Sequence, residues 1–239
     1  LKDAIDHLYS TELAAIVVAN NEAIPAILLD AAERTETPLF TSSLAGPVLM
    51  SHLGHYLTQS LAESTSLHGV FLEVLGIGVL LKGDAGVGKS ELALELITRG
   101  HRLVADDVVD LKHVAPEILE GNCPPLIRDF LEVRGLGILN IRFLFGETAV
   151  KPQKNLKLIV ELVHPQDIGK AGLNRLDMVA STETILGVAI PKVCIPVAAG
   201  RNLAVLVEVA VRNHILKSRG INPLDQFIKR QQAAIDGNS

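Results

Sequence analysis

The sequence predicts an α/β protein in which a glycine-rich loop joins a strand to a helix. The octapeptide Gly83–Ser90 matches the pattern G-x-x-x-x-G-K-S at every fixed position. Two β-branched and apolar runs, Val70–Leu75 and Ile77–Leu81, precede the loop and are typical of paired strands. Residues 91–99 are mostly strong helix formers, and Gly100 follows them as a helix-ending residue. Strand, loop and helix therefore occur in the order that this motif requires.

A smaller α/β domain is predicted before these strands. The runs Ala14–Val18 and Ala26–Leu29 are candidate elements, and apolar residues recur at helical spacing between positions 49 and 61. Since the chain starts at Leu1 without an initiator Met or a signal-peptide pattern, we expect this first domain to be a partial one.

The boundary between the two domains is predicted at the polar stretch Glu63–Ser66. Residues 1–66 would then form the partial N-terminal domain, and residues 67–239 the domain that carries the loop.

Composition limits the classes of partner. The 239 residues, of which 48% are hydrophobic, suffice to bury a substantial core. A formal net charge of −5 argues against general binding to nucleic acid or to anionic membranes, and no apolar run has the length that a membrane-spanning helix needs. Cys123 and Cys194 provide neither a disulfide framework nor a metal quartet, so we expect a cytoplasmic protein.

The loop residues suit the binding of nucleotide phosphates. Glycines at positions 83, 86 and 88 allow backbone conformations in which successive N–H groups point at phosphate oxygens. Lys89 is a mobile cation that reaches the β- and γ-phosphates, and the hydroxyl of Ser90 is a ligand for Mg²⁺. We therefore predict a phosphotransferase that uses a nucleotide. The predicted nucleotide-binding residues are Gly83, Asp84, Ala85, Gly86, Val87, Gly88, Lys89 and Ser90.

Acidic residues follow along the chain. Residues 103–105 are predicted to form a strand that ends in Asp106 and Asp107, at the edge where open α/β sheets bind ligands. One carboxylate would help to hold the metal and the other would accept a proton from a hydroxyl, whereas the alternative is a pair that begins a turn. Glu132, within the glycine-containing stretch Leu131–Asn140, is either a second metal ligand or part of a surface ion pair.

More elements are predicted beyond residue 150. Strands are expected at Leu156–Val163 and Val193–Val197. Asn202 is expected to cap a helix that ends at Gly220, and a last amphipathic helix starts at Pro223.

The combination of these motifs resembles one family, HPr kinase/phosphorylase. The residues that carry the resemblance, in the family's order, are His68-Gly69-Val70, Gly83–Ser90, Glu91–Asp107 with Arg99-Gly100-His101-Arg102 inside it, Leu131–Asn140, and Gly200-Arg201-Asn202-Leu203-Ala204. The similarity runs from about residue 12 to about residue 230. It implies a P-loop-containing C-terminal kinase domain, preceded by the end of a longer N-terminal domain.

The resemblance implies an activity and partners. The family is bifunctional: it phosphorylates a serine of the small carrier protein HPr with ATP or pyrophosphate, removes that phosphate by phosphorolysis, and so regulates carbon metabolism. It also implies ATP and Mg²⁺ as cofactors, a homohexamer, and a C-terminal region that contributes to HPr docking and to oligomer contacts.

The resemblance also implies roles for individual residues, which are transferred from the family to the matching positions of this sequence. Lys89 would contact the transferred phosphoryl group, and Ser90 with Glu132 would hold Mg²⁺. Asp107 resembles the general base of the kinase reaction and the general acid of its reversal. His68, whose position alone favours a structural histidine, matches an active-site position of the family.

Two segments depart from the family's pattern. Residues 164–180 match it poorly, and Arg175 there resembles a catalytic arginine, with an exposed loop arginine as the alternative. Ala198 and Ala199 stand where the family usually has an Arg-Pro pair that is linked to dephosphorylation. Loss of that arginine removes one anion contact, whereas Arg201 remains.

Two other classes of function stay open. A P-loop kinase or ATPase that acts on a small molecule would need no protein acceptor, and a non-catalytic nucleotide sensor would bind ATP without turnover. The intact set Lys89, Ser90, Asp106, Asp107 and Glu132 argues against a sensor. Dependence of phosphate transfer on a protein acceptor would decide the other case.

Overall fold

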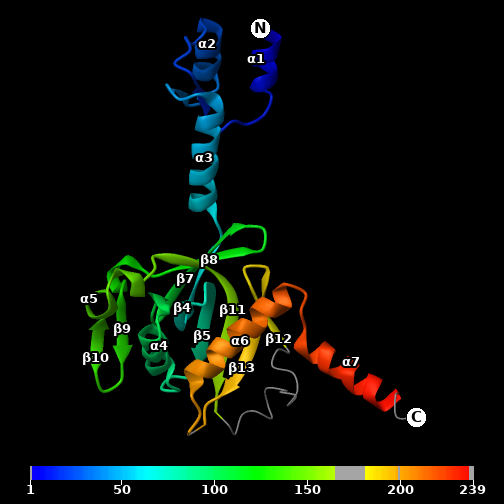
Figure 1. The fold of residues 1–239 in the computed structure, drawn as a ribbon. Helices are drawn as coiled ribbons and strands as arrows, with labels where there is room; N and C mark the ends of the chain where they lie inside the picture. The colour runs from blue at the N-terminus through cyan, green and yellow to red at the C-terminus, as the bar shows by residue number, and fades with distance from the viewer. Residues whose placement is uncertain (1, 165–180, 199, 237–239) are drawn as a thin grey trace. The chain divides into compact units, whose positions relative to one another are not determined.

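The computed structural model describes residues 2–164, 181–198 and 200–236 (Figure 1). The chain divides into two compact units, Leu1–Leu61 and Ala62–Ser239. Each unit combines helices with strands, so the predicted α/β class is confirmed. The predicted boundary after Ser66 lies beyond the observed division, because residues 64–68 form a strand that pairs within the second unit.

The first unit is a small α/β arrangement. Its elements are α1 (Lys2–Leu8), β1 (Ile16–Val18), α2 (Ala26–Arg34), β2 (Leu39–Thr41) and α3 (Gly46–Leu61). Strands β1 and β2 pair in parallel, and Ile5, Ala31 and Ala32 are the buried apolar residues. A parallel pair needs a crossover connection, which α2 provides.

The second unit is built on a curled sheet. Its first elements are β3 (Ser64–His68), β4 (Val70–Val74), β5 (Ile77–Gly83), α4 (Lys89–Thr98), β6 (Arg102–Ala105), β7 (Val108–Ala115), β8 (Ile118–Asn122), η1 (Pro125–Ile127), β9 (Phe130–Val133) and β10 (Gly137–Asn140). Those that follow are α5 (Ile141–Phe145), η2 (Glu147–Ala149), β11 (Gln153–Val163), β12 (Ser181–Ile185), β13 (Val188–Pro196), α6 (Leu203–Ser218) and α7 (Pro223–Asp236). The described residues place nine strands in one sheet, in the order β3-β7-β8-β11-β5-β4-β6, with β13 beside β11 and β12 beside β13.

The sheet topology brings two strand ends to one edge. Strand β4 is antiparallel to both β5 and β6, so β5 and β6 run in the same direction and end on the same side. The β4–β5 hairpin turns at Leu75 and Gly76, whose φ values of 51° and 82° match the two-residue turn that fits twisted strands. The loop after β5 and the aspartate doublet after β6 therefore share an edge.

Two apolar clusters cover the two faces of the central strands. Helices α4 and α6 lie side by side against one face, and their buried residues pack on β4, β5 and β11 (Figure 1). On the other face Phe71, Leu80 and Ile159 pack with residues of β7, β8 and β12, inside the curl of the sheet. Burial from both sides holds the strand ends in fixed positions, which a preorganised site requires.

Candidate active site

A cleft of about 510 Å³ lies at the shared edge of β5 and β6. It is lined by four segments: the residues before and at the start of β4, the glycine-rich loop with the start of α4, the aspartate doublet, and the β9–β10 hairpin. The lining residues are His68, Gly69, Val70, Ala85, Gly86, Gly88, Lys89, Ser90, Glu91, Asp106, Asp107, Glu132, Val133, Arg134, Gly135 and Gly137. Most of these residues are polar or glycine, as a site for a charged ligand requires.

The loop presents its cation and hydroxyl to this cleft. Lys89 is only 8% exposed, and its Nζ donates to the carbonyl oxygens of Gly83 and Asp84 at 2.8 and 3.0 Å. Gly83 and Gly86 have φ values of 140° and 78°, in the region that favours glycine. Five of the eight predicted nucleotide-binding residues line the cleft: Ala85, Gly86, Gly88, Lys89 and Ser90. Val87 is instead buried in the core.

The two aspartates of the doublet occupy different environments. Asp106 is 8% exposed, and its Oδ2 accepts a hydrogen bond of 2.9 Å from the N–H of Glu132. Burial raises the pKa of Asp106, while hydrogen bonds from the backbones of Glu132 and Asp107 oppose the rise. The side chain of Asp107 is 69% exposed, and its Oδ1 lies 3.0 Å from Nδ1 of His68.

Asp107 also has an unusual backbone conformation. Its φ is 66°, and the N–H of Val108 bonds to the carbonyl of Asp106 at 2.8 Å, which closes a tight turn between β6 and β7. Aspartate tolerates this left-handed region better than most residues. The turn directs neighbouring residues differently, so that Asp106 is buried while Asp107 reaches His68 on the adjacent strand β3.

The stretch Leu131–Asn140 forms most of an antiparallel hairpin, β9–β10. Leu131 and Val133 are buried in the core, while Glu132 and Arg134 are exposed and face the cleft. The guanidinium of Arg134 lies so close to Gly86 that a Cβ built there would be 3.2 Å from one of its nitrogens. No role was predicted for Arg134, although the alternation of apolar and charged residues from Leu131 to Arg134 indicates that Glu132 and Arg134 share one face of the strand.

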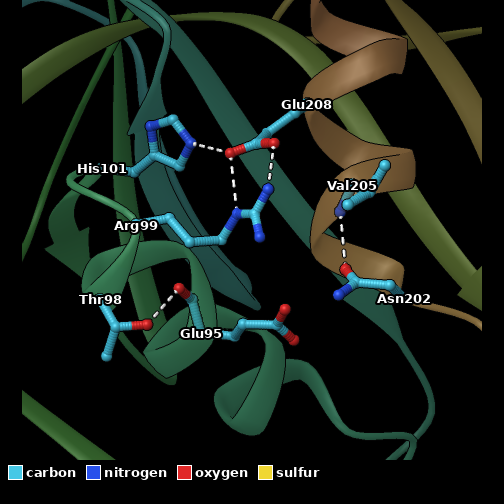
Figure 2. A network of polar contacts seen from close by, with 7 residues as sticks. All are labelled: Glu95, Thr98, Arg99, His101, Asn202, Val205 and Glu208. Carbon is cyan, nitrogen blue, oxygen red and sulfur yellow. Dashed lines mark hydrogen bonds and ion pairs between the residues drawn. The ribbon is translucent and has the colours of Figure 1, made fainter.

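The far end of α4 carries a separate network of charges, which Figure 2 shows. Arg99 donates to both carboxylate oxygens of Glu208 on α6, from Nε at 3.0 Å and from Nη2 at 2.7 Å, and Nε2 of His101 lies 2.9 Å from Oε1 of Glu208 (Figure 2). The hydrogen bond from Arg99, helped by His101 and opposed by burial, lowers the pKa of Glu208 to about 2. This network lies outside the cleft and ties α4 to α6.

The cleft thus collects most of the predicted site residues. His68, Lys89, Ser90, Asp107 and Glu132 all line it, although they come from distant parts of the sequence. Arg175 and Ala199, to which two further predictions refer, lie outside the described residues.

The cleft contains oxygen ligands that suit a hard cation such as Mg²⁺. Ser90 supplies a hydroxyl oxygen and Glu132 a carboxylate, which are the ligand types that Mg²⁺ prefers. The described part of the chain has no cluster of three or more His, Cys, Asp or Glu suited to a metal. Since Mg²⁺ in nucleotide enzymes takes few protein ligands and completes its shell with phosphate oxygens and waters, these residues fit the ion. Within the same residues no helix has the length and apolar character needed to cross a membrane.

The fold and the cleft define a class: an α/β protein in which a glycine-rich loop between a strand and a helix shares a cleft with acidic residues from a neighbouring strand and hairpin. Comparison with protein families narrows this class. Residues 59–231 match the model of the HPr serine kinase C-terminal domain, and residues 1–57 match that of the HPr serine kinase N terminus. The chain therefore belongs to the HPr serine kinase family.

Individual relatives agree with this assignment. The chain is 56% identical to the HPr kinase/phosphorylase of Chromobacterium violaceum, over 96% of this chain and 72% of the relative. It is 52% identical to that of Nitrosomonas europaea, over 100% of this chain and 74% of the relative. Among solved structures, the Hpr(Ser) kinase/phosphatase of Coxiella burnetii matches with a TM-score of 0.61 at 43% identity, over 65% of this chain and 93% of that one.

Proposed function

We propose that this protein transfers a phosphoryl group from ATP or pyrophosphate to a serine of HPr, and removes it by phosphorolysis with inorganic phosphate. The observation that carries the proposal is the meeting of Lys89, Asp107 and His68 in one cleft of a chain that belongs to this family. Among the described residues, two carbonyl oxygens alone hold the Lys89 ammonium, so a phosphate can recruit it.

Asp107 is the proposed general base. A serine hydroxyl is a poor nucleophile at neutral pH, so a carboxylate within hydrogen-bond reach must accept its proton as the oxygen attacks phosphorus. The bond from the γ-phosphorus to its bridging oxygen then breaks, and ADP leaves. The side chain of Asp107 is exposed, so an acceptor hydroxyl can approach it, and His68 beside it would orient the carboxylate. Asp106, buried and hydrogen-bonded to the N–H of Glu132, is a positioning residue.

The reverse reaction uses the same groups. An oxygen of inorganic phosphate attacks the phosphorus of phosphoserine, the serine oxygen leaves, and Asp107 returns the proton to it, so that the products are serine and pyrophosphate. Lys89 and Arg134 offset negative charge on the transferred group from two sides of the cleft.

Mg²⁺ is proposed as the metal, with Ser90 and Glu132 as its ligands. When bound, it supplies positive charge at the phosphate oxygens. A homohexamer and a cytoplasmic location are part of the proposal, supported by family membership. Arg175 is proposed as a further catalytic cation on the resemblance alone.

The test is phosphate transfer from γ-labelled ATP to purified HPr, with ATP alone as the control and a chase with inorganic phosphate. We expect acid-stable label on HPr that the chase releases as pyrophosphate. Label that resists the chase would leave a kinase without phosphorolysis. Equal ATP hydrolysis with and without HPr would overturn the proposal in favour of a small-molecule enzyme.

A further inference from the structure

The hairpin β9–β10 reaches the candidate active site from outside the main sheet. Within the described residues it forms a separate two-stranded sheet, so no strand of the nine-stranded sheet fixes its tilt by hydrogen bonds. Arg134 and Gly135 at its turn line the cleft, and so does Glu132 on β9. The positions of these charged groups therefore depend on the contacts that hold the hairpin elsewhere.

Contacts with the core hold the first strand of the hairpin. Leu131 and Val133 are 0% and 3% exposed and belong to the apolar cluster that contains α4. Oδ2 of Asp106 accepts the hydrogen bond from the N–H of Glu132. Strand β10 is less buried, and Ile138 in it is 72% exposed. The base of the hairpin, where β9 begins and β10 ends, is a further point of attachment.

A cluster of three charged residues closes this base. Asp129 directly precedes β9, and its Oδ2 accepts a hydrogen bond of 2.7 Å from Nε of Arg142 on α5. Nη1 of Arg142 also donates to Oε2 of Glu147 in η2. The backbone adds a hydrogen bond of 2.8 Å from the N–H of Ile141 to the carbonyl of Asp129. Asp129, Arg142 and Glu147, the base cluster, thus join the residue before β9 to the helix after β10.

The surroundings of the base cluster limit its movement. The side chains of Asp129 and Arg142 are 17% and 34% exposed. Ile141 at the start of α5 is fully buried, and the side chain of Asn140 accepts a hydrogen bond of 2.9 Å from the N–H of Phe143. Because a guanidinium donates in a rigid planar fork, its two carboxylate partners fix the direction of α5 relative to the start of β9.

We propose that the base cluster positions Glu132 for the divalent cation, with Arg142 as the positioning residue. Glu132 is three residues from Asp129, or about 10 Å along the strand at about 3.3 Å per residue. A tilt of the hairpin about its base displaces Glu132 relative to Ser90, the other proposed ligand. Mg²⁺ demands near-ideal octahedral geometry, so such a displacement weakens metal binding. The inference rests on the proposed function, which assigns the metal to these two residues.

Metal affinity is measured by titration with Mn²⁺, which binds the same oxygen ligands as Mg²⁺ and is detected by electron paramagnetic resonance. A non-hydrolysable ATP analogue is present at saturation. We expect the Kd for Mn²⁺ to rise about tenfold in Arg142→Gln, as is typical when a residue that orients a metal ligand is lost. Arg142→Lys keeps a cation that can contact one carboxylate, so it should restore part of the affinity.

A second variant separates the charge of the base cluster from the backbone. Asp129 has a φ of 69°, a conformation that asparagine also tolerates. Asp129→Asn therefore preserves the backbone while it removes the carboxylate charge, and the Kd for Mn²⁺ should rise as in Arg142→Gln. Affinity for the analogue without metal should stay within about twofold in both variants, because neither residue lines the cleft. Retained analogue binding also shows that the variants are folded.

Arg99→Gln is the matched control for loss of a paired arginine. The side chain of Arg99 is 35% exposed, close to the 34% of Arg142, and it too binds a carboxylate. Its partner Glu208 lies outside the cleft, so the control should lose stability and keep its Kd for Mn²⁺ within about twofold. A general loss of stability is thereby distinguished from loss of positioning.

A combination of variants tests whether the base cluster acts through Glu132. Glu132→Gln should weaken Mn²⁺ binding at least as much as Arg142→Gln does. The double variant Glu132→Gln/Arg142→Gln should then bind Mn²⁺ no more weakly than Glu132→Gln, because a residue that only positions Glu132 has no effect once that carboxylate is gone.

Three outcomes would overturn the inference: unchanged Mn²⁺ affinity in Arg142→Gln and Asp129→Asn, equal weakening in Arg99→Gln, or additive losses in the double variant. Transfer of phosphate to HPr is measured separately. A parent protein that does not phosphorylate HPr would contradict the proposed function, whereas the Mn²⁺ titrations would still decide the role of the base cluster.

Discussion

The two ends of helix α4 show opposite ways of using charge. At its N-terminal end, Lys89 and Ser90 face an open cleft, and in the part of the chain that the structure describes the ammonium bonds only to backbone carbonyls. At the C-terminal end, Arg99 and His101 are closed off by Glu208, which binds both (Figure 2). The cation at one end faces an open cleft, and the cations at the other end are paired with a carboxylate of the protein.

Carboxyl pKa values follow the same division. Burial raises the pKa of Asp106 beside the cleft, whereas the arginine and histidine beside Glu208 lower its pKa to about 2. A carboxylate whose ionised form is disfavoured by burial lowers the stability of the fold, and proteins retain such groups where function needs them. A carboxylate with two cationic partners contributes to stability instead. Changes at the cleft should therefore affect transfer or binding, and changes at the Glu208 network should affect folding.

The largest effect is expected from Asp107→Asn. Loss of the carboxylate removes the proton acceptor, so both directions of transfer should fall by about 10²–10⁴-fold, while nucleotide affinity stays within about threefold. Transfer kinetics in both directions and nucleotide titration measure the two quantities. Asp30→Asn, on the exposed side of α2 in the first unit and outside the cleft, is the matched control for loss of a carboxylate. Normal turnover in Asp107→Asn would refute its role.

A smaller effect on binding is expected from Gly86→Ala. A side chain at this φ of 78° is strained and meets the guanidinium of Arg134, so nucleotide affinity should fall about tenfold. Gly76→Ala has a similar φ of 82°, with no atom near the added Cβ. It should lose comparable stability and bind nucleotide normally. Equal affinities of the two variants would show that Gly86 has no special part in the site.

The Glu208 network should respond in the opposite manner. Glu208→Gln removes charge-assisted hydrogen bonds to Arg99 and His101, so the free energy of unfolding should fall by about 2 kcal/mol with little change in nucleotide affinity. Urea denaturation measures the loss. Glu95→Gln, on α4 near the same arginine but without a bond to it in Figure 2, should change stability by less than about 0.5 kcal/mol.

The contribution of Glu208 should also depend on pH. Its pKa is about 2 in the folded protein, below the ordinary value of 4.5. The stabilisation is therefore fully present above pH 4.5 and is lost as the pH falls toward 2. The difference in stability between the parent protein and Glu208→Gln should therefore be smaller at pH 3 than at pH 5. A difference that grows on acidification would contradict this assignment.

The smallest effect is expected at the start of α6. The side chain of Asn202 accepts a hydrogen bond of 2.9 Å from the N–H of Val205 (Figure 2). Asn202→Ala should cost about 1 kcal/mol of stability, because one N–H at the helix end loses its partner. Asn213→Ala, inside the same helix, removes an asparagine without removing a cap and should be neutral or slightly stabilising. Thermal denaturation compares the two variants.

Local elements were largely predictable from sequence. Strands β4 and β5, helix α4 with its end before Gly100, and the Asn202 cap all follow patterns contained within about ten residues, and each prediction is confirmed. The hairpin at Leu131–Asn140 was harder to predict from sequence, because its two short strands pair with each other outside the main sheet. Periodicity over so few residues distinguishes a hairpin poorly from a loop.

The sequence by itself determined the glycine-rich segment between strand and helix and, through resemblance, the family, because the spacing of its glycines, lysine and serine is contained within eight consecutive residues. Only the tertiary structure placed His68 beside Asp107, Arg134 beside Gly86 and Glu208 between Arg99 and His101. These contacts join residues on different strands and helices. Their distances depend on the order, direction and curl of the sheet, which no short stretch of sequence encodes.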